Sequence, residues 1–117
     1  MVIDDDTDIL HSISMVLTLH DFCVVELDGS ENIVGAIRLH SPDLVLTDYM
    51  MPKLNGGQIC KMIKQDPLTA DLPVILMSAY HKLAMSVAGF GYDAYLSKPF
   101  DNDKLVQTIN KLLDSST

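Results

Sequence analysis

Short apolar runs and one-sided helical stripes alternate along the whole chain. Continuous apolar runs are typical of strands buried in a parallel sheet, whereas apolar residues at the helical repeat predict amphipathic helices. The predicted strands are residues 1–3, 22–27, 43–48, 74–77 and 94–97. The predicted helices carry their apolar stripes at residues 9–17, 33–40, 59–63, 83–88 and 105–113. This alternation predicts an α/β fold, a (βα)5 three-layer sandwich with helices on both faces of a parallel sheet.

Polar residues mark several of the predicted helix boundaries. Asp6 or Thr7 can cap the first helix, because a short polar side chain accepts hydrogen bonds from the free N–H groups of a first turn. The dipeptide Ser41-Pro42 is expected to end the second helix, since a residue before proline is disfavoured in the helical region. The third helix is expected to stop near residues 66–67.

Four of the predicted strands end on residues that phosphoryl transfer can use. Asp4 and Asp5 follow the first strand, Asp48 ends the third, Ser78 follows the fourth and Lys98 follows the fifth. Functional groups in open parallel sheets gather just beyond the carboxyl ends of the strands. If these strands are neighbours, their ends form a patch that can bind a hard divalent cation and handle a phosphate.

Each of these residues also has an ordinary structural explanation. The acidic run at residues 4–6 could be a solvated cap of the first helix, and Asp48 could simply terminate a strand. Ser78 and Lys98 mean little alone, because serine is common after strands and most lysines are solvated. A charged group such as Asp48 at the end of a buried strand is costly without a partner, however, and Lys98 or a metal could be that partner. The joint placement of these residues therefore favours a functional site.

Composition narrows the class of protein. The chain has 117 residues, 48% of them apolar, which predicts one folded domain with a real core. The net charge of −8 argues against a nucleic-acid surface and against anionic membranes. Cys23 and Cys60 lack metal or redox spacing, and buried free thiols are the expected state of both. Without a leader-like segment or a long apolar run, the sequence predicts a soluble, cytoplasmic protein.

Four segments together resemble a known family. They are residues 2–10 with the acidic pair, 43–56 around Asp48, 72–79 with Ser78, and 91–100 with Lys98-Pro99. In these segments, and in their order, the chain resembles the CheY-like receiver domain of two-component response regulators. The resemblance spans essentially the whole chain and implies a flavodoxin-like fold with sheet order 2-1-3-4-5.

The resemblance implies a role for each acidic residue. Asp48 would be the phosphoacceptor, taking a phosphoryl group from the phosphohistidine of a sensor histidine kinase or phosphotransfer protein. The implied cofactor is Mg²⁺, bound by Asp5, Asp48 and the backbone carbonyl of Met50, with Asp4 acting through water. The chain would thus be a signalling phosphoacceptor and not a turnover enzyme.

The resemblance also assigns the residues around the phosphoryl group. Lys98, the Ser78 hydroxyl and the Ala79 backbone N–H would bind the phosphoryl oxygens, and the bond before Pro99 would be cis. Ser78 and Tyr95 would form a switch that changes the surface of the fourth helix, fifth strand and fifth helix. A downstream protein target would bind that surface, with a homodimer on phosphorylation as a further expectation and no direct contact with nucleic acid or membrane.

Some features depart from the family pattern. Only three residues precede Asp4, so the first strand is shorter than is usual and could be truncated, and no output domain follows in residues 1–117. Met50 and Tyr80 occupy positions where the family tunes phosphate lifetime.

Other functions remain open at this stage. A receiver-like scaffold that has lost phosphorylation is one, although the intact set of site residues argues against it. A Mg²⁺-dependent phosphatase of the haloacid-dehalogenase type is another, but Asp8 stands where its motif needs threonine. An FMN-binding flavodoxin fits least, because acids occupy the place of a phosphate-binding loop.

Overall fold

The structure is a computed structural model that describes residues 1–79 and 91–115. The predicted helix at residues 83–88 and Tyr80 lie outside the described residues. The strands are β1 (Val2–Ile3), β2 (Glu26–Leu27), β3 (Val45–Asp48), β4 (Val74–Ser78) and β5 (Ala94–Ser97). The helices are α1 (Thr7–Leu19), α2 (Ile33–His40), α3 (Gly56–Gln65) and α5 (Asn102–Ser115).

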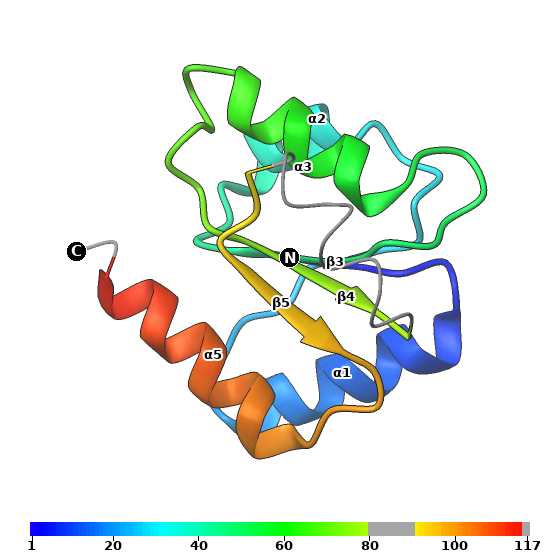
Figure 1. Ribbon diagram of the computed structural model, residues 1–117, viewed down its shortest axis with the longest axis vertical. Helices are drawn as coiled ribbons and strands as arrows, with labels where there is room; N and C mark the ends of the chain where they lie inside the picture. Colours follow the sequence, from blue (N-terminus) through cyan, green and yellow to red (C-terminus); the bar gives the residue numbers. More distant parts are fainter. Residues whose placement is uncertain (80–90, 116–117) are drawn as a thin grey trace.

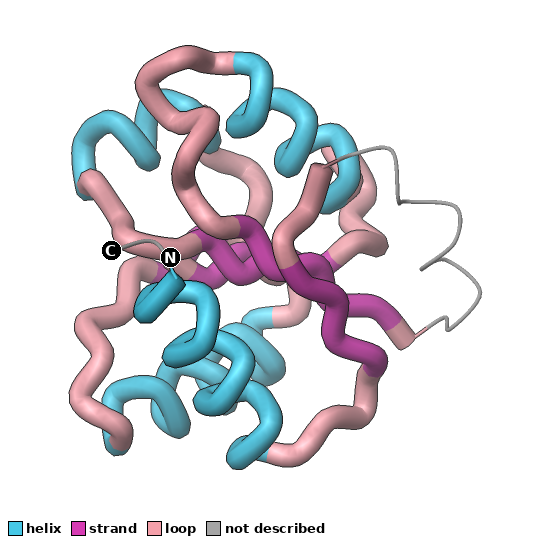
Figure 2. The backbone as a smooth tube through the Cα atoms, turned by 60° about the vertical axis from the view of Figure 1, so that its left-hand side comes forward, coloured by secondary structure: helices cyan, strands magenta, loops and turns pink. Residues whose placement is uncertain are grey.

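The strands form one parallel sheet in the order β2-β1-β3-β4-β5, which confirms the predicted topology. Helices α2 and α3 cover one face of the sheet, and α1 and α5 cover the other (Figure 1). Figure 2 shows the three layers edge on, with the strands between two layers of helix. The predicted (βα)5 sandwich is therefore confirmed for the described part of the chain.

Alternation along the strands divides the core into two apolar clusters. Val45 and Val74 pack toward α2 and α3, whereas their neighbours Leu46 and Ile75 pack toward α1 and α5. All four side chains are buried, as expected for strands covered by helices on both faces. Burial of such a side chain contributes about 1.5–3 kcal/mol, so these clusters hold the strands whose ends carry the polar residues.

Three strands, β1, β2 and β3, are shorter than predicted, and the largest difference is in β2, which is limited by the length of β1. The central strand β1 has two residues, which pair with Glu26 and Leu27 on one side and with β3 on the other. Residues 22–25 extend past β1, so strand pairing there is limited to the Val25 carbonyl, which accepts from Val2 N–H at 2.9 Å. The predicted strand at residues 22–25 is therefore wrong.

The two cysteines differ in burial. Cys23 lies in the unpaired segment and is exposed, so the expectation of a buried thiol is wrong for this residue. Cys60 on α3 is buried, and burial raises the pKa of its thiol to about 11. A thiol with that pKa is almost fully protonated at neutral pH, which fits a structural role.

Helices α1 and α3 each begin at a side chain that caps the free N–H groups of the first turn. Asp6 is the N-cap of α1, and its carboxylate accepts from the N–H groups of Asp8 and Ile9. Helix α3 begins with a capping box in which Asn55 and Gln58 bond reciprocally. These caps fix where α1 and α3 leave the strand ends.

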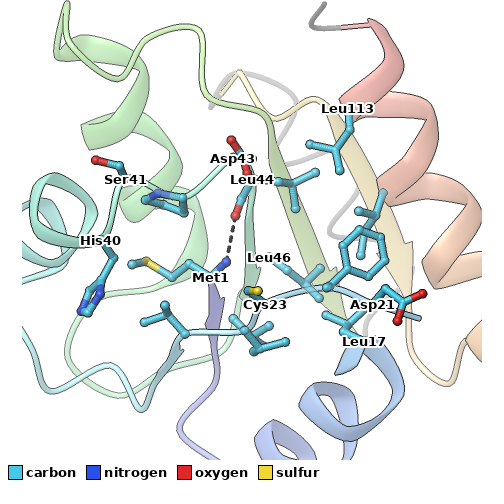
Figure 3. A pocket seen from close by; sticks show the side chains of 16 residues that line it. Met1, Leu17, Asp21, Cys23, His40, Ser41, Asp43, Leu44, Leu46 and Leu113 are labelled. Carbon is cyan, nitrogen blue, oxygen red and sulfur yellow. Dashed lines mark hydrogen bonds between the residues drawn. The ribbon is translucent and has the colours of Figure 1, made fainter. Parts of the chain in front are cut away.

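A cavity of about 410 Å³ lies at the amino ends of the strands, opposite the carboxyl ends that carry the predicted site residues (Figure 3). The Met1 α-ammonium donates a hydrogen bond to the Leu44 carbonyl at 3.0 Å within it. Burial lowers the pKa of this ammonium, and the nearby charge of Asp43 acts in the opposite direction. Apolar side chains of the surrounding strands and helices form much of the lining, together with Cys23 and His40. No predicted site residue is among the described residues that line this cavity.

Candidate functional site

Three carboxylates meet at the carboxyl end of the sheet. Asp4 and Asp5 follow β1, and Asp48 ends the adjacent strand β3. Each offers an oxygen that lies within 4.8 Å of the others. The parallel pairing of β1 with β3 produces this cluster, because it brings both strands to an end at the same edge.

Lys98, which follows β5, adds a positive charge to the three carboxylates. Its Nζ lies 2.9 Å from Asp48 Oδ1 and 3.3 Å from Asp4 Oδ2. The pairing of β5 with β4 sets the position of Lys98, since the Lys98 backbone N–H donates to the carbonyl of Ser78 on β4 at 2.8 Å. The Lys98–Pro99 peptide bond is cis. One ammonium thus bridges two of the three acids.

The two aspartates after β1 have different surroundings. Asp4 is buried, and its Oδ1 accepts from the Asp6 N–H at 3.0 Å while Oδ2 faces Lys98. Asp5 is exposed, as expected for the next residue along an extended chain. Asp4 therefore has both carboxylate oxygens engaged, whereas Asp5 is the solvent-exposed member of the cluster.

Burial and charge act against each other at Asp48. Burial raises the pKa of the Asp48 carboxyl, the hydrogen bond and charge of Lys98 lower it, and Asp4 and Asp5 raise it, so the net shift is upward. Burial also lowers the pKa of Lys98, but the hydrogen bond and charge of Asp48, aided by Asp4, outweigh it. The two upward shifts have different causes: desolvation raises the pKa of Asp48, whereas the neighbouring carboxylates raise the pKa of Lys98.

Two further residues hold the Asp48 backbone, and neither was assigned a role from the sequence. The Thr47 side chain is fully buried, and its hydroxyl donates to the Asp48 carbonyl at 3.1 Å. Gly56 at the start of α3 packs so tightly that an added Cβ would lie 2.4 Å from the same carbonyl oxygen. A hydroxyl within the apolar run 44–47 was the available signal for Thr47.

The remaining predicted residues lie around this edge. Ser78 is fully buried at the end of β4, next to β3, and Ala79 after it is exposed. Met50 is exposed two residues after Asp48. Tyr95 lies half-buried on β5 and packs against the core cluster beneath α2 and α3. The structure therefore gathers Asp4, Asp5 and Asp48 in one cluster, pairs Lys98 with Asp4 and Asp48, and places the others on the adjoining strands and loop.

The donor set fits a hard divalent cation. All candidate ligands are carboxylate oxygens, which Mg²⁺ prefers, and Mg²⁺ commonly uses one or two carboxylates with water and phosphate oxygens. Asp5 and Asp48 can supply these carboxylates, while Asp4 is held by other partners. All three candidate ligands carry negative charge, so they repel one another until a cation is bound.

Comparison with known proteins identifies the family. The response regulator receiver domain matches residues 1–110. The chain belongs to this family. Receiver domains of two-component systems receive phosphate from histidine kinases, bind Mg²⁺ at an acidic pocket and are signalling domains. Membership of the receiver family replaces the phosphatase and flavodoxin interpretations of the sequence.

Similar proteins include regulators of different lengths. The DNA-binding dual master transcriptional regulator RpaA of Synechocystis is 34% identical over 116 residues, which are 97% of this chain and 48% of RpaA. Protein PilH of Pseudomonas aeruginosa is 31% identical over 97% of this chain and 95% of PilH. The chain spans about half the length of several curated relatives, including RpaA and PhoB proteins.

Solved structures share the fold. The crystal structure of a response regulator from Chloroflexus aurantiacus J-10-fl has a TM-score of 0.90 and 26% identity, and the match covers 97% of this chain and 94% of that one. No helix within residues 1–79 and 91–115 has the length and apolar character needed to span a bilayer.

Proposed function

We propose that this receiver domain takes a phosphoryl group onto Asp48 from the phosphohistidine of a sensor histidine kinase or a phosphotransfer protein. The supporting observation is the convergence of Asp4, Asp5 and Asp48 within 4.8 Å, with Lys98 Nζ 2.9 Å from Asp48. An Asp48 carboxylate oxygen bonds to phosphorus as the P–N bond breaks, and the leaving imidazole keeps the electron pair and takes up a proton.

The proposed metal-binding residues combine this carboxylate cluster with the pattern of the receiver family. Asp5, Asp48 and the backbone carbonyl of Met50 would hold Mg²⁺, with Asp4 acting through water. When bound, the ion neutralises charge on the phosphoryl oxygens, and positioning and electrostatics supply most of the catalysis in such transfers. An indirect role suits Asp4, because its oxygens already accept from Asp6 N–H and face Lys98.

The chain's own cation and donors bind the transferred group. Lys98 exchanges its direct pairing with Asp48 for a phosphoryl oxygen, which keeps its ammonium paired throughout the reaction. The Ser78 hydroxyl and the Ala79 N–H, at the end of the neighbouring strand, bind the other oxygens. Charge-assisted hydrogen bonds of this kind are stronger than neutral ones, so the three donors together hold the phosphoryl group in place.

Phosphorylation would then act on a conformational equilibrium. Movement of Ser78 toward the phosphoryl group leaves room for the Tyr95 ring to turn inward. The surface made by β5, α5 and the helix predicted at residues 83–88 changes with this ring. A downstream protein target binds this surface, with a homodimer as a second form of assembly. Residues 83–88 lie outside the described residues. The phosphoryl group shifts the equilibrium between two conformations that both exist without it.

Intact mass spectrometry tests the acceptor and the metal together. The folded chain is incubated with acetyl phosphate, with Mg²⁺ or with a chelator, beside the Asp48→Asn variant. The matched control is Asp71→Asn, which alters an exposed aspartate in the turn before β4. In the reaction, Asp48 attacks phosphorus and acetate leaves.

We expect one phosphoryl adduct that requires Mg²⁺, disappears in Asp48→Asn and persists in Asp71→Asn. A folded wild-type chain without an adduct in Mg²⁺ would contradict the proposal and favour a scaffold. An adduct that survives in Asp48→Asn would place the acceptor elsewhere.

A further inference from the structure

The loop that leads into β5 is held by hydrogen bonds at Asp93, directly after Tyr92. Gly91 has a φ of +81°, a conformation that residues with side chains rarely adopt. Asp93 is bonded three times: its N–H donates to the Val74 carbonyl at 2.8 Å, and its Oδ2 accepts from Val74 N–H and Lys64 Nζ, each at 2.8 Å. The Tyr92 backbone is therefore fixed relative to α3 and β4.

The lysine of this clamp is itself constrained. Lys64 Nζ donates to the Leu72 carbonyl at 2.8 Å and to the Ala70 carbonyl at 3.4 Å, in addition to its bond with Asp93. It lies in the last turn of α3, so it ties the end of this helix to the turn before β4 and to the start of β5. The loop position of Tyr92 thus depends on tertiary contacts from two other elements.

The fixed loop places the Tyr92 ring against Tyr95. The ring centroids lie 6.0 Å apart with an interplanar angle of 54°. Both tyrosines are half-buried and pack on the core cluster beneath α2 and α3. This separation and tilt fall within the favourable range for aromatic pairs, and such a pair biases a two-state equilibrium about two- to tenfold. Tyr92 is therefore a fixed aromatic surface on which the movable ring rests.

The same short strand connects this ring pair with the acidic cluster. Tyr95 pairs in register with Leu76 on β4, and two residues after it β5 ends at Ser97. Lys98 comes next and forms the ion pair with Asp48. The Tyr92–Tyr95 contact and the Lys98–Asp48 pair thus belong to one conformation of β5 and its flanks.

We propose that Tyr92 is a positioning residue of the switch, whose ring holds Tyr95 in the conformation that accompanies the Lys98–Asp48 ion pair. The inference rests on the proposed function, because it gives Tyr92 a part in the change that phosphorylation of Asp48 produces. A contact that stabilises one state weakens binding of any ligand that favours the other, by the same factor. Loss of the Tyr92 ring therefore favours the phosphoryl-bound state.

Fluorine NMR of the full chain labelled with 3-fluorotyrosine tests this role. The chain contains 4 tyrosines, and the Tyr95 signal is assigned from its loss in Tyr95→Phe. The probe is beryllofluoride, a phosphoryl analogue, titrated in Mg²⁺ into the wild type and into Tyr92→Ala and Tyr92→Phe. Tyr92→Phe retains the ring and is the matched control, and Tyr92→Leu retains apolar volume if the alanine variant does not fold.

In the wild type, beryllofluoride is expected to move the Tyr95 signal. In Tyr92→Ala or Tyr92→Leu, the signal without the analogue should already lie part-way to that position, and the analogue should bind about two- to tenfold more tightly. Tyr92→Phe should match the wild type. A phenylalanine variant that behaves like the alanine one would overturn the role of the ring.

The outcomes separate this inference from the function on which it rests. A wild-type Tyr95 signal that shifts, with identical titrations in all Tyr92 variants, overturns the role of Tyr92 and leaves the switch intact. A wild-type chain that binds the analogue without any shift of Tyr95 overturns the switch and the role of Tyr92 together. Phosphorylation of Asp48 is measured separately by mass and stands in either case.

Discussion

At the scale of single residues, the Asp48 carboxylate is where function opposes stability. It is buried, it has two other acids close by, and its pKa is raised on folding. A carboxyl with a raised folded-state pKa adds stability below its unfolded pKa, near 3.8, and loses that contribution as the pH rises through the folded value. At neutral pH the ionised Asp48 therefore costs stability.

We predict that Asp48→Asn stabilises the apoprotein at neutral pH while it abolishes phosphorylation. The amide has nearly the same shape and no charge to desolvate, and Lys98 keeps Asp4 as a partner at 3.3 Å. The expected gain is about 0.5–2 kcal/mol at pH 7, typical of relieving a strained functional site. It should shrink as the pH falls toward the ordinary pKa of aspartate, because wild-type Asp48 is then protonated as well.

Urea unfolding in a chelator, at pH 7 and again at about pH 4, measures this difference. The exposed Asp71→Asn substitution should stay within about 0.5 kcal/mol of the wild type. A loss of stability in Asp48→Asn at pH 7 would show that the Lys98 pairing outweighs the desolvation of Asp48.

At the scale of elements, the acceptor is positioned by the packing of α3 against the end of β3. Gly56 opens α3, and its N–H donates to the Tyr49 carbonyl at 2.9 Å. Its Cα approaches the Asp48 carbonyl so closely that a side chain cannot fit without backbone movement. Thr47 binds this carbonyl from within the strand. The peptide after the acceptor is therefore held from both elements.

Gly56→Ala is predicted to destabilise the protein by about 1–3 kcal/mol, the usual cost of overpacking, and to slow phosphorylation of Asp48. The added methyl would meet backbone atoms of Asp48 and Tyr49 at 2.4–3.0 Å, and neither can yield as a flexible side chain would. Urea unfolding gives the first effect and the rate of acetyl phosphate labelling the second.

Gly35→Ala in α2 is the matched control for this prediction. The three atoms nearest to its Cβ would belong to the Asn32 side chain, at 3.3–3.5 Å, and alanine is favoured over glycine within a helix by about 0.5–1 kcal/mol. Stability equal to or slightly above the wild type is expected. If both alanine variants lose the same stability, the close approach at Gly56 is not the cause.

Some features of the strands and loops could be predicted from the sequence, and others could not. Apolar runs ending on Asp48, Ser78 and Lys98 predicted parallel strands whose carboxyl ends could form one cluster. The order of the strands came from the resemblance to receiver domains, because apolar runs do not show which strands are neighbours. The pairing of residues 22–25 was not predictable from their own apolar pattern, since it depends on the length of β1. The Lys64–Asp93 clamp depends on a loop conformation, which carries no periodic signal.

The Tyr92 contact was missed for a related reason. An aromatic residue just before a strand has no preferred partner until the turn that precedes it is known. Gly91, with its left-handed backbone, sets the direction in which the Tyr92 ring leaves the chain. Residues that act through strand ends can thus be found from sequence, whereas residues that act through loops need the structure.

At the scale of the whole molecule, charge and topology concentrate negative potential at one edge of the sheet. The chain carries a net charge of −8, and three of its acids are gathered within 4.8 Å around the ends of β1 and β3. These strands lie next to each other at the centre of the sheet, so their repulsion opposes the packing of the two apolar clusters. A divalent cation at this edge should relieve that repulsion and couple metal binding to global stability.

We predict that Mg²⁺ raises the melting temperature of the wild-type chain in a concentration-dependent manner. A ligand that binds only the folded state contributes about 2.7 kcal/mol at a hundred times its Kd, and each kcal/mol corresponds to about 3–6 °C for a domain of this size. Calorimetry at increasing MgCl₂ measures the effect, and NaCl of matched ionic strength should reproduce only a small part of it. Asp5→Asn should remove most of the Mg²⁺ dependence at little cost to stability, because Asp5 is exposed, whereas Asp71→Asn should retain it. Equal responses to Mg²⁺ and NaCl would mean that screening of the net charge, and not a bound ion, accounts for the stabilisation.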